Sequence, residues 1–286
     1  MTENKYCVYT ALTGNYDALL KIKCTNENYD YICFTDAPDL IQRKKVGIWN
    51  IWKLEYNQLD SARNSRWPKI MGYKVLDSYE ASIYIDSNVN ILTPYIYDLV
   101  NSSNQNLLIP RHSNRGCIYD EIEICRDLGL DNEDILLKVQ QELVAHNMPS
   151  NYGLNEANLI YRKHHVPQID NIMDSWWNYV EHFSKRDQVS LSYVLWSYGI
   201  KIDDIAIPNI RKHNKNFAVY PHLKRFGLLY PLVFLVLAIT RSYNPQELLP
   251  TLHLLHHLAV STKRWVVTLR ASLGTLYSIF LTIINK

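Results

Sequence analysis

The clearest chemical signal in this chain is Asp86-Ser87-Asn88, which follows the apolar segment Ala81–Ile85. A short apolar run predicts a buried β-strand, and Asp86 then stands at its carboxyl end. In α/β proteins ligands bind outside the carboxyl ends of the strands, where a carboxylate suits a divalent cation that also binds a diphosphate. Asn88 would add a neutral and weaker oxygen ligand. The alternative is that Asp86 merely closes the strand and begins a turn.

A second apolar run, Tyr31–Thr35, also ends in a carboxylate, that of Asp36. Asp36 and Asp86 would then both lie where a ligand of an α/β sheet binds. The two carboxylates together indicate an enzyme that handles a nucleotide-activated group.

Three basic residues offer a partner for phosphate. Arg63, Arg66 and Lys69 recur every three residues within a predicted helix, so they share one side of it and form a cationic strip. The alternative is a solvated charged face. Trp67 interrupts the strip, which makes full solvation less favourable.

Two further segments could contact a donor sugar or an acceptor. Arg111 and His112 begin a loop after a predicted strand, and Asn155 precedes a short apolar segment that ends near Arg162. A charged surface loop explains Arg111 and His112 equally well.

The last two candidates lie towards the end of the main domain. Asp187 and Gln188 open a predicted helix, where they could face the reacting carbon of a sugar. Helix capping also explains Asp187, because a negative charge is favourable in the first turn. His213 could complete the coordination of a metal, although a lone histidine in a loop is usually just solvated.

The elements that must position these residues alternate along the chain. Strands are predicted at 5–11, 31–36, 47–56, 81–86, 105–110 and 158–161, and helices at 61–78, at 119–147 in two pieces, at 168–184 and at 187–198. Strands that alternate with helices predict parallel strands covered by helices. The chain is therefore expected to have an α/β fold.

Composition excludes several classes of protein. Of the 286 residues, 47% are hydrophobic and 20% are charged, which suffices for one large domain and an accessory region. Neither GxxxxGK(S/T) nor GxGxxG occurs, so the P-loop and dinucleotide fingerprints are absent. The five cysteines include no CxxC pair, and residues 1–5 lack the apolar core of a signal peptide. Both observations favour a cytosolic protein without a zinc site.

The composition changes after residue 225. The segment 226–286 carries a net charge of +4, which leaves −2 for the rest of a chain whose total is +2. This distribution does not resemble a nucleic-acid-binding domain. Two uncharged runs of 15 residues, 226–240 and 271–285, are shorter than the roughly 20 residues of a spanning helix. They predict apolar helices that lie in a membrane interface. Packing on the main domain or on a partner, and a spanning hairpin, are the alternatives.

Several of these segments stand in an order that resembles a known family. They are Tyr9–Asp17, Phe34–Asp36, Ala62–Arg66, Tyr84–Asn88 and Arg186–Gln188. This order is similar to that of the TOD1/MUCI70-type glycosyltransferase-like family over about residues 5–215. More distantly, the chain resembles the glycogenin and galactosyltransferase class of retaining enzymes with a GT-A fold.

The resemblance implies a fold and roles for single residues. The fold would be a GT-A-like (Rossmann-like) mixed sheet flanked by helices. Asp86 would be a ligand of Mn²⁺ or Mg²⁺, Arg63 or Lys69 would contact the diphosphate, and Asp187 with Gln188 would contact the donor sugar. In the same scheme Thr10, Ala11 and Asp36 would line the nucleotide, and His213 would correspond to a late metal-binding histidine. Asn88 departs from the Asp-x-Asp pattern of that class.

Together these features predict a glycosyltransferase that uses a nucleotide diphosphate sugar, with UDP as the expected nucleotide, and a glycan or lipid-linked acceptor. Residues 1–225 would form the catalytic domain and residues 226–286 an apolar, basic helical region. The expected location is the cytoplasmic face of a bacterial cell membrane, without nucleic acid as a partner. A nucleotidyltransferase and a non-catalytic carbohydrate-binding protein at the membrane are the competing interpretations.

Overall fold

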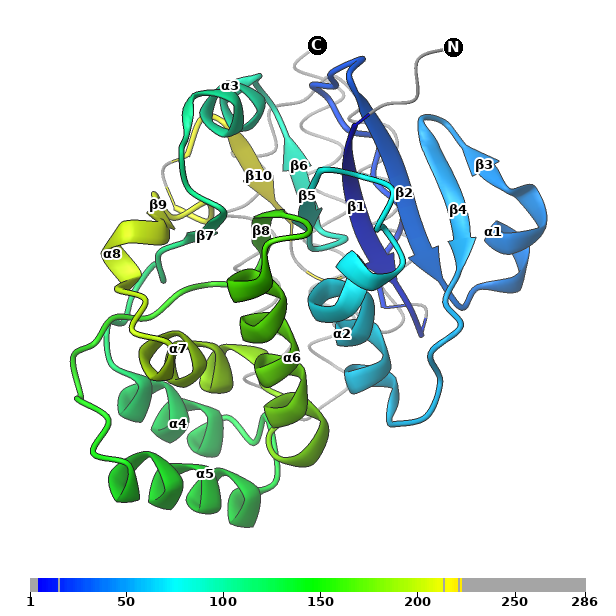
Figure 1. The fold of residues 1–286 in the computed structure, drawn as a ribbon. Coiled ribbons are helices and arrows are strands. Elements are labelled where there is room, and N and C mark those ends of the chain that lie inside the picture. Colours follow the sequence, from blue (N-terminus) through cyan, green and yellow to red (C-terminus); the bar gives the residue numbers. More distant parts are fainter. Residues whose placement is uncertain (1–4, 15, 213, 221, 223–286) are drawn as a thin grey trace, which may run out of the picture.

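A mixed sheet of eight strands forms the centre of the part of the chain that the structure describes (Figure 1). The structure is a computed structural model and describes residues 5–14, 16–212, 214–220 and 222. Across the sheet the order is β3 (Lys45–Val46), β4 (Trp49–Lys53), β2 (Tyr29–Thr35), β1 (Tyr6–Leu12), β5 (Ala81–Ile85), β8 (Leu159–Lys163), β7 (Leu107–Pro110) and β9 (Ala206–Ile207). A smaller sheet pairs β6 (Val89–Ile91) with β10 (Phe217–Val219) in antiparallel fashion.

Parallel pairing brings the carboxyl ends of three central strands to one edge of the sheet. β1 is parallel to β2 and to β5, with Tyr9 opposite Ile32 on one side and Tyr84 on the other. β4 extends this parallel half beside β2, whereas β8 runs antiparallel to both β5 and β7. The loops that carry Asp36 and Asp86 therefore leave the sheet at the same edge.

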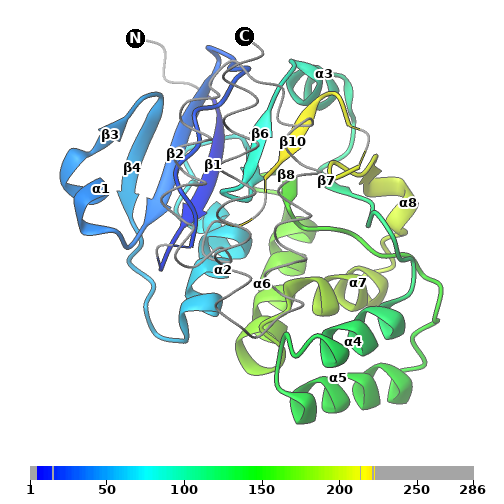
Figure 2. The ribbon, with the colours of Figure 1, turned by 180° about the vertical axis from the view of Figure 1, so that it is seen from behind.

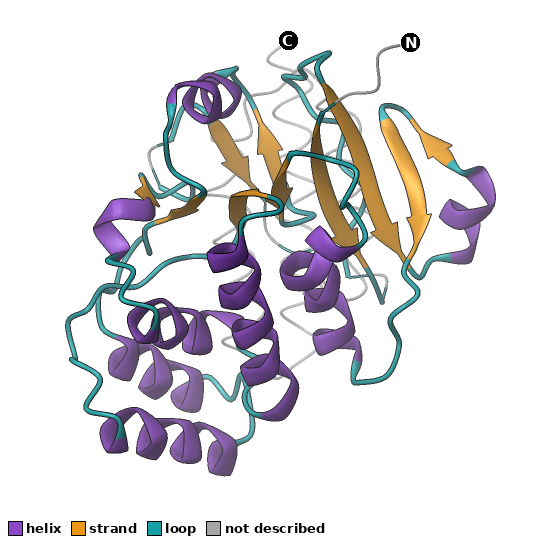
Figure 3. Cartoon of the chain, in the orientation of Figure 1, coloured by secondary structure: helices purple, strands orange, loops and turns teal. Residues whose placement is uncertain are grey.

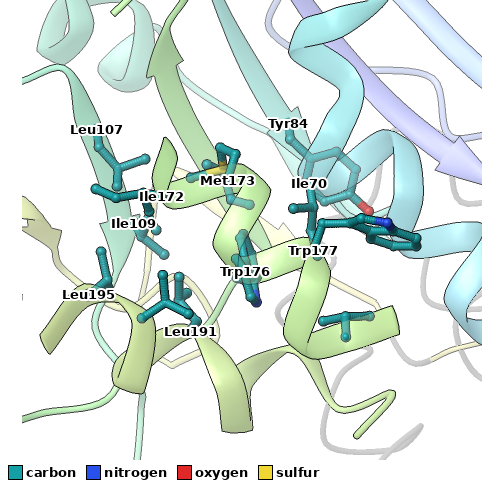
Figure 4. Packing of buried hydrophobic residues seen from close by; sticks show 14 of the residues in the cluster. Ile70, Tyr84, Leu107, Ile109, Ile172, Met173, Trp176, Trp177, Leu191 and Leu195 are labelled. Carbon is teal, nitrogen blue, oxygen red and sulfur yellow. The ribbon is translucent and has the colours of Figure 1, made fainter. Parts of the chain in front are cut away.

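Both faces of the sheet are buried, because side chains along each strand alternate between two apolar clusters. In β1, Cys7 and Tyr9 belong to one cluster, and Val8 and Leu12 belong to the other. The helices α2, α6, α7, α4 and α5 contribute to the first cluster, whereas α3 and the strands β6 and β10 contribute to the second. Figure 4 shows part of the first cluster, with Trp176 of α6 gathered close to Leu191 of α7.

The helices have clear boundaries and lie largely to one side of the sheet (Figures 2 and 3). They are α1 (Pro38–Arg43), α2 (Ser61–Met71), the 3₁₀ turn η1 (Gly72–Lys74), α3 (Tyr95–Ser102), α4 (Ile118–Asp127), α5 (Glu133–Ala145), α6 (Pro167–His182), α7 (Asp187–Ser197) and α8 (Ile202–Ile205). α2 packs against β1 and α6, and α7 packs against α6 and α4. This arrangement brings α2 and the start of α7 together near the edge of the sheet described above.

Local interactions hold α2, the helix that carries the cationic strip. Asp60 caps its start by accepting hydrogen bonds from the backbone N–H groups of Ala62 and Arg63. At its end, the fully buried guanidinium of Arg162 donates to the carbonyl oxygens of Lys69 (2.8 Å) and Ile70 (2.6 Å). These carbonyls lie in the last turn, where partners within the helix are missing. Arg162 therefore fixes the backbone of Lys69.

The predicted α/β fold is confirmed, with differences in detail. The sheet is mixed, as the family resemblance implied, whereas the alternation of elements alone had predicted parallel strands; β8 runs antiparallel to β5. The helix predicted at 61–78 ends at Met71 and continues as the turn η1. At Gly72 a Cβ atom would lie 3.0 Å from the hydroxyl oxygen of Tyr9, so a larger residue there would require the tyrosine to shift. The elements that the sequence analysis did not predict are α1, α3, α8, β3, β6, β9 and β10.

The region 226–286, predicted to be apolar helices at a membrane, lies outside the described residues. Among the residues that the structure does describe, no helix is both long and apolar enough to cross a membrane.

Candidate active site

A pocket of about 370 Å³ lies at the edge of the sheet where β1 and β5 end. Its walls come from the loop after β1, the first turns of α2, the residues after β5 and the beginning of α7, together with Arg211 and His222. Asp86, Lys69 and Asp187 are among the side chains that line it. The pocket thus has the position at which α/β proteins bind ligands and a volume within the usual range for a small-molecule site.

Asp86 lies in this pocket rather than in the core. Its side chain is 26% exposed, and its Oδ1 accepts a hydrogen bond of 2.9 Å from the hydroxyl of Tyr84. Burial, reinforced by the charge of Asp86, holds the pKa of Tyr84 well above its usual range. Tyr84 therefore stays protonated and orients the carboxylate as a donor. The Nζ of Lys69 lies 3.4 Å from the same oxygen.

Lys69 also joins Asp86 to Asp187. Its Nζ is 2.6 Å from Oδ2 of Asp187, and the Nε of Arg66 is 3.7 Å from Oδ1. Burial alone would raise the pKa of Asp187, but the charges of Lys69 and Arg66 outweigh it and hold that pKa well below its usual range. Asp187 is therefore an ionised carboxylate despite an exposed fraction of only 5%.

The pocket carries an excess of positive charge. Among the described residues its lining contains five basic side chains, those of Arg66, Lys69, Lys185, Arg186 and Arg211, against the two carboxylates of Asp86 and Asp187. The N-terminus of α7 opens on the same space, since Asp187 and Gln188 are its first two residues. Cations and a helix N-terminus both favour a bound anion such as a diphosphate.

The three residues predicted to line a nucleotide occupy different positions. Ala11 lines the pocket, whereas Thr10 is buried in β1 with 1% of its surface exposed. The carboxylate of Asp36 accepts hydrogen bonds of 3.0 and 3.1 Å from the backbone N–H of Gly14. Asp36 therefore holds the loop after β1, and Gly14 supplies the positive φ of 60° that this loop requires.

Of the cationic strip, Arg66 and Lys69 reach the pocket and Arg63 does not. The guanidinium of Arg63 donates to the carbonyl oxygens of Val180 (2.7 Å) and Phe183 and pairs with Asp60. These contacts join α2 to the end of α6. The structure thus places Lys69, and not Arg63, where a diphosphate could be contacted.

Arg111, His112 and Asn155 do not belong to the lining of the pocket. Arg111 forms an exposed ion pair with Asp203. Asn155 is 1% exposed, and its amide donates to the carbonyl oxygens of Ile109 and Pro110 at 3.3 Å. These residues stabilise the junction after β7.

His112 is enclosed by charged neighbours. Its Nε2 lies 3.5 Å from Oε1 of Glu156 and 3.8 Å from Oε2 of Glu121. Its Nδ1 accepts hydrogen bonds from the backbone N–H groups of Asn114 and Arg115. Burial lowers the pKa of His112 even though both glutamates would raise it. Glu156 also accepts a 2.8 Å hydrogen bond from Arg211, and Arg211 in turn lines the pocket.

The predicted metal ligands are only partly brought together. Asn88 is 5% exposed and lies outside the lining of the pocket, with its Nδ2 donating to the carbonyl oxygen of Tyr220 at 2.5 Å. His213 lies outside the described residues. In the described ranges, no group of three or more His, Cys, Asp or Glu side chains could hold a metal ion.

A different histidine reaches the pocket. His222 is part of its lining, and its Nδ1 lies 2.8 Å from Oδ2 of Asp17. The same oxygen accepts a 2.7 Å hydrogen bond from Ser87, the residue after Asp86. An ionised carboxylate can only accept, so the contact favours a proton on Nδ1, which puts the acceptor lone pair of the neutral ring on Nε2. The sequence contained no spacing that marks His222, because β10 brings it to Asp17 only through its pairing with β6.

Comparisons with known proteins find similar sequences and structures. The sequence profile described as the TOD1/MUCI70, glycosyltransferase-like domain matches residues 8–208. A curated relative, the probable hexosyltransferase MUCI70 of Arabidopsis thaliana, is 29% identical over 190 residues. That match covers 62% of this chain and 32% of the relative, so the chain spans about a third of the length of that protein.

Two solved structures of glycosyltransferases are similar at low identity. The bifunctional glycosyltransferase WbbM in its apo form matches with a TM-score of 0.42 and 11% identity over 68% of this chain and 38% of that one. Mouse xyloside xylosyltransferase 1, also in its apo form, matches with a TM-score of 0.41 and 9% identity over 68% of this chain and 83% of that one.

Proposed function

The chain belongs to the family of TOD1/MUCI70 glycosyltransferase-like domains, and on this premise we propose that it transfers a sugar from a nucleotide diphosphate sugar. UDP is the nucleotide proposed, and the acceptor is a glycan or lipid-linked sugar of a surface polysaccharide or glycoconjugate. One observation carries the proposal. The ammonium group of Lys69 lies 3.4 Å from Asp86 and 2.6 Å from Asp187 in a pocket at the carboxyl edge of the sheet.

In this proposal the basic wall of the pocket receives the diphosphate. Lys69 and Arg66 of α2 stabilise the negative charge that develops as the bond between the sugar and the diphosphate breaks. Both side chains are held in place before any substrate binds, because each is paired with Asp187. Groups that are fixed in advance lose little energy to reorganisation, and a single such donor is typically worth about 3 kcal/mol of barrier.

The sugar lies against Asp187 and Gln188 at the start of α7. Since Asp187 is ionised, it accepts hydrogen bonds from sugar hydroxyl groups, and its charge favours the positive charge that develops at the anomeric carbon. The acceptor oxygen forms the new bond to that carbon as the bond to the phosphate oxygen breaks. With retention of configuration, which we propose, the departing phosphate takes the proton of the acceptor hydroxyl, and no side chain acts as the base.

Two residues of the pocket lining, Asp86 and His222, offer donor atoms of the kind that a cation shared with the substrate needs. Asp86 offers a carboxylate, and His222 directs its Nδ1 to Asp17, an arrangement typical of histidines that bind metal through Nε2. Mg²⁺ usually takes one or two protein ligands together with substrate phosphates, and Mn²⁺ suits the same oxygen donors. Asp86 and His222 would hold this cation, which would neutralise charge on the diphosphate.

Replacement of Asp86 tests the proposed reaction. With UDP-sugars as donors and Mn²⁺ present, Asp86→Ala should abolish the release of UDP while the thermal unfolding midpoint stays close to that of the wild type. The matched control is Asp39→Ala, an exposed carboxylate in the first turn of α1, which should keep full activity.

The released product separates the competing functions. Free UDP together with a glycosylated acceptor supports sugar transfer, whereas pyrophosphate would indicate nucleotidyl transfer. Binding of UDP-sugars without either product would indicate a non-catalytic carbohydrate-binding protein. A fully active Asp86→Ala variant would refute the role of this carboxylate.

We also propose that residues 226–286 attach the domain formed by residues 1–225 to the cytoplasmic face of the cell membrane. The support is the net charge of +4 and the two uncharged runs in that segment. Full-length protein should sediment with liposomes that contain anionic lipid, and a protein that ends at residue 225 should stay in solution. Equal behaviour of the two proteins would contradict the proposal.

A further inference from the structure

Asn88 stands where the Asp-x-Asp pattern has its second acid, yet its side chain is turned away from the pocket. We infer that Asn88 is a positioning residue, whose amide places His222 against Asp17 and the pocket. This inference rests on the proposed function in so far as His222 serves the donor site.

The first support is the double contact between Asn88 and Tyr220. The side-chain Nδ2 of Asn88 donates to the carbonyl oxygen of Tyr220 (2.5 Å), and the backbone N–H of Tyr220 donates to the carbonyl oxygen of Asn88 (2.8 Å). Tyr220 precedes His222 by only two residues. The backbone of the segment is therefore fixed at Tyr220, two residues before the imidazole that lines the pocket.

Neighbouring contacts show that the whole of segment 216–220 lies along the chain that follows Asp86. β10 pairs with β6, with Val219 opposite Val89. Asn216 accepts hydrogen bonds from the backbone N–H of Leu92 (2.9 Å) and from the hydroxyl of Thr93 (2.8 Å). Among the described residues the contact at Asn88 is the last of this series before His222, so it supports the imidazole together with the contact between His222 and Asp17.

Asn90 lies two residues after Asn88 and binds residues 21 and 23, in the segment that follows Asp17. Its Oδ1 accepts from the backbone N–H of Lys23 (2.9 Å), and its Nδ2 donates to the carbonyl oxygen of Lys21 (3.0 Å). That segment follows Asp17, which accepts a hydrogen bond from Ser87 and lies against His222. Asn88 and Asn90 are neighbours in one stretch of chain. Asn88 binds the segment before His222, and Asn90 binds the segment after Asp17.

The chemistry of the amide explains why position 88 is asparagine. An amide offers N–H donors, whereas an ionised carboxylate can only accept. An aspartate at position 88 would face the carbonyl oxygen of Tyr220 with a second acceptor, and the two oxygens would repel each other. Asn88→Asp would complete the Asp-x-Asp pattern and yet remove the side-chain hydrogen bond to Tyr220, which leaves only backbone contacts to hold the segment before His222.

The substitution Asn88→Asp should have opposite effects depending on whether Asn88 is a metal ligand or a residue that positions His222. If Asn88 were a metal ligand, Asn88→Asp would strengthen the binding of Mn²⁺, because a carboxylate is the better ligand. If Asn88 positions His222, the same change should weaken the binding of Mn²⁺ in the presence of UDP by about 10- to 100-fold, as is typical when the support of a metal ligand is removed.

The experiment uses the full chain and four variants: Asn88→Asp, Asn88→Ala, His222→Gln and the double variant Asn88→Ala/His222→Gln. Mn²⁺ affinity is titrated in the presence of UDP, and UDP release is followed with UDP-sugars. Both variants of Asn88 should be weakened, and the double variant should be no weaker than His222→Gln alone, because residues that act through one another are not additive. Asn101→Asp, the same change on an exposed asparagine of α3, should behave as the wild type.

A structural readout keeps the inference testable without turnover. The nitrogen NMR signals of His222, identified by their loss in His222→Gln, should report a proton on Nδ1 in the wild type and should shift in Asn88→Asp and Asn88→Ala. Signals that stay unchanged, tighter Mn²⁺ binding by Asn88→Asp, or additive losses in the double variant would each overturn the inference. A wild type that neither binds nor cleaves UDP-sugars would refute the proposed function instead, and the NMR comparison would still decide the role of Asn88.

Discussion

Two clusters of buried charge differ in how their charges are neutralised. In the pocket cluster (Lys69, Asp86 and Asp187), a lysine joins two carboxylates that border an open space. In the loop cluster (His112, Arg115, Glu121 and Glu156), the charged and polar groups mainly contact one another or the backbone, and Arg211 is its link to the pocket.

Burial and charge therefore do not by themselves identify a reactive site in this protein. Residues of both clusters stand in segments that the sequence analysis selected as candidates. Lys69, Asp86 and Asp187 line the pocket described above, whereas the four residues of the loop cluster are not part of its lining. The loop cluster uses its charges to close the junction after β7, so its removal should affect stability more than chemistry.

Among the tests that compare the two clusters, Lys69→Met should have the largest effect. This change removes the ammonium group that contacts both Asp86 and Asp187. It should lower kcat by about 10²- to 10³-fold, as for other fixed groups that stabilise developing charge. UDP release at saturating donor is the measurement. Lys5→Met, the same change on an exposed lysine paired with Glu80, is the control and should keep the activity of the wild type. Equal kcat values for Lys69→Met and Lys5→Met would show that the pocket cluster, like the loop cluster, has no catalytic role.

Glu121→Gln should act on stability instead. Glu121 is 2% exposed and accepts a 2.7 Å hydrogen bond from the Nε of Arg115. Loss of a buried hydrogen bond to a charged partner should lower the free energy of unfolding by about 2 kcal/mol. Urea unfolding measures this, and kcat per folded molecule should remain within about threefold of the wild type. A large fall in kcat without loss of stability would show that the loop cluster is catalytic.

The two clusters should lose stability in different ranges of pH. The folded pKa of Asp187 is lowered from 3.8, so the unfolded chain binds the proton first and stability falls as the pH drops below about 4 towards the folded pKa. The folded pKa of His112 is lowered from 6.5, so the unfolded chain again binds the proton first, but stability falls below about pH 6.5.

Urea unfolding at several pH values tests this separation. Asp187→Asn should flatten the profile only below about pH 4, and His112→Gln should flatten it below about pH 6.5. Burial lowers the pKa of His164 to about 4, so His164 contributes in the same range as His112 and the slope should not vanish. Identical profiles for His112→Gln and the wild type would contradict the neutral, enclosed state of His112.

The smallest effect is expected for Arg111→Ala. The ion pair with Asp203 is about half exposed on the arginine side and more so on the aspartate side. Such pairs typically contribute 0–1 kcal/mol, so the free energy of unfolding should change by less than about 1 kcal/mol. The KM for the donor should not change either, because Arg111 is outside the lining of the pocket. A rise in KM of more than about tenfold, or 1.4 kcal/mol, would restore Arg111 to the donor site.

Residue types and their spacing were enough to predict the strands that carry Asp36 and Asp86, the helices that carry Lys69 and Asp187, and the family to which the chain belongs. Apolar runs, helical spacing and capping residues act locally, so they can be recognised without knowledge of contacts. The pockets of such proteins are also predictable in outline, since parallel strands end at one edge.

Which polar residues meet depends on long-range packing. Arg63 and Lys69 share one helix, but the guanidinium of Arg63 donates to a carbonyl oxygen of α6, whereas the side chain of Lys69 lines the pocket. Asn88 and His222 are far apart in sequence, and their relation depends on the pairing of β6 with β10. The direction of a side chain and the identity of its partner are set by long-range packing, which residue types and spacing do not encode.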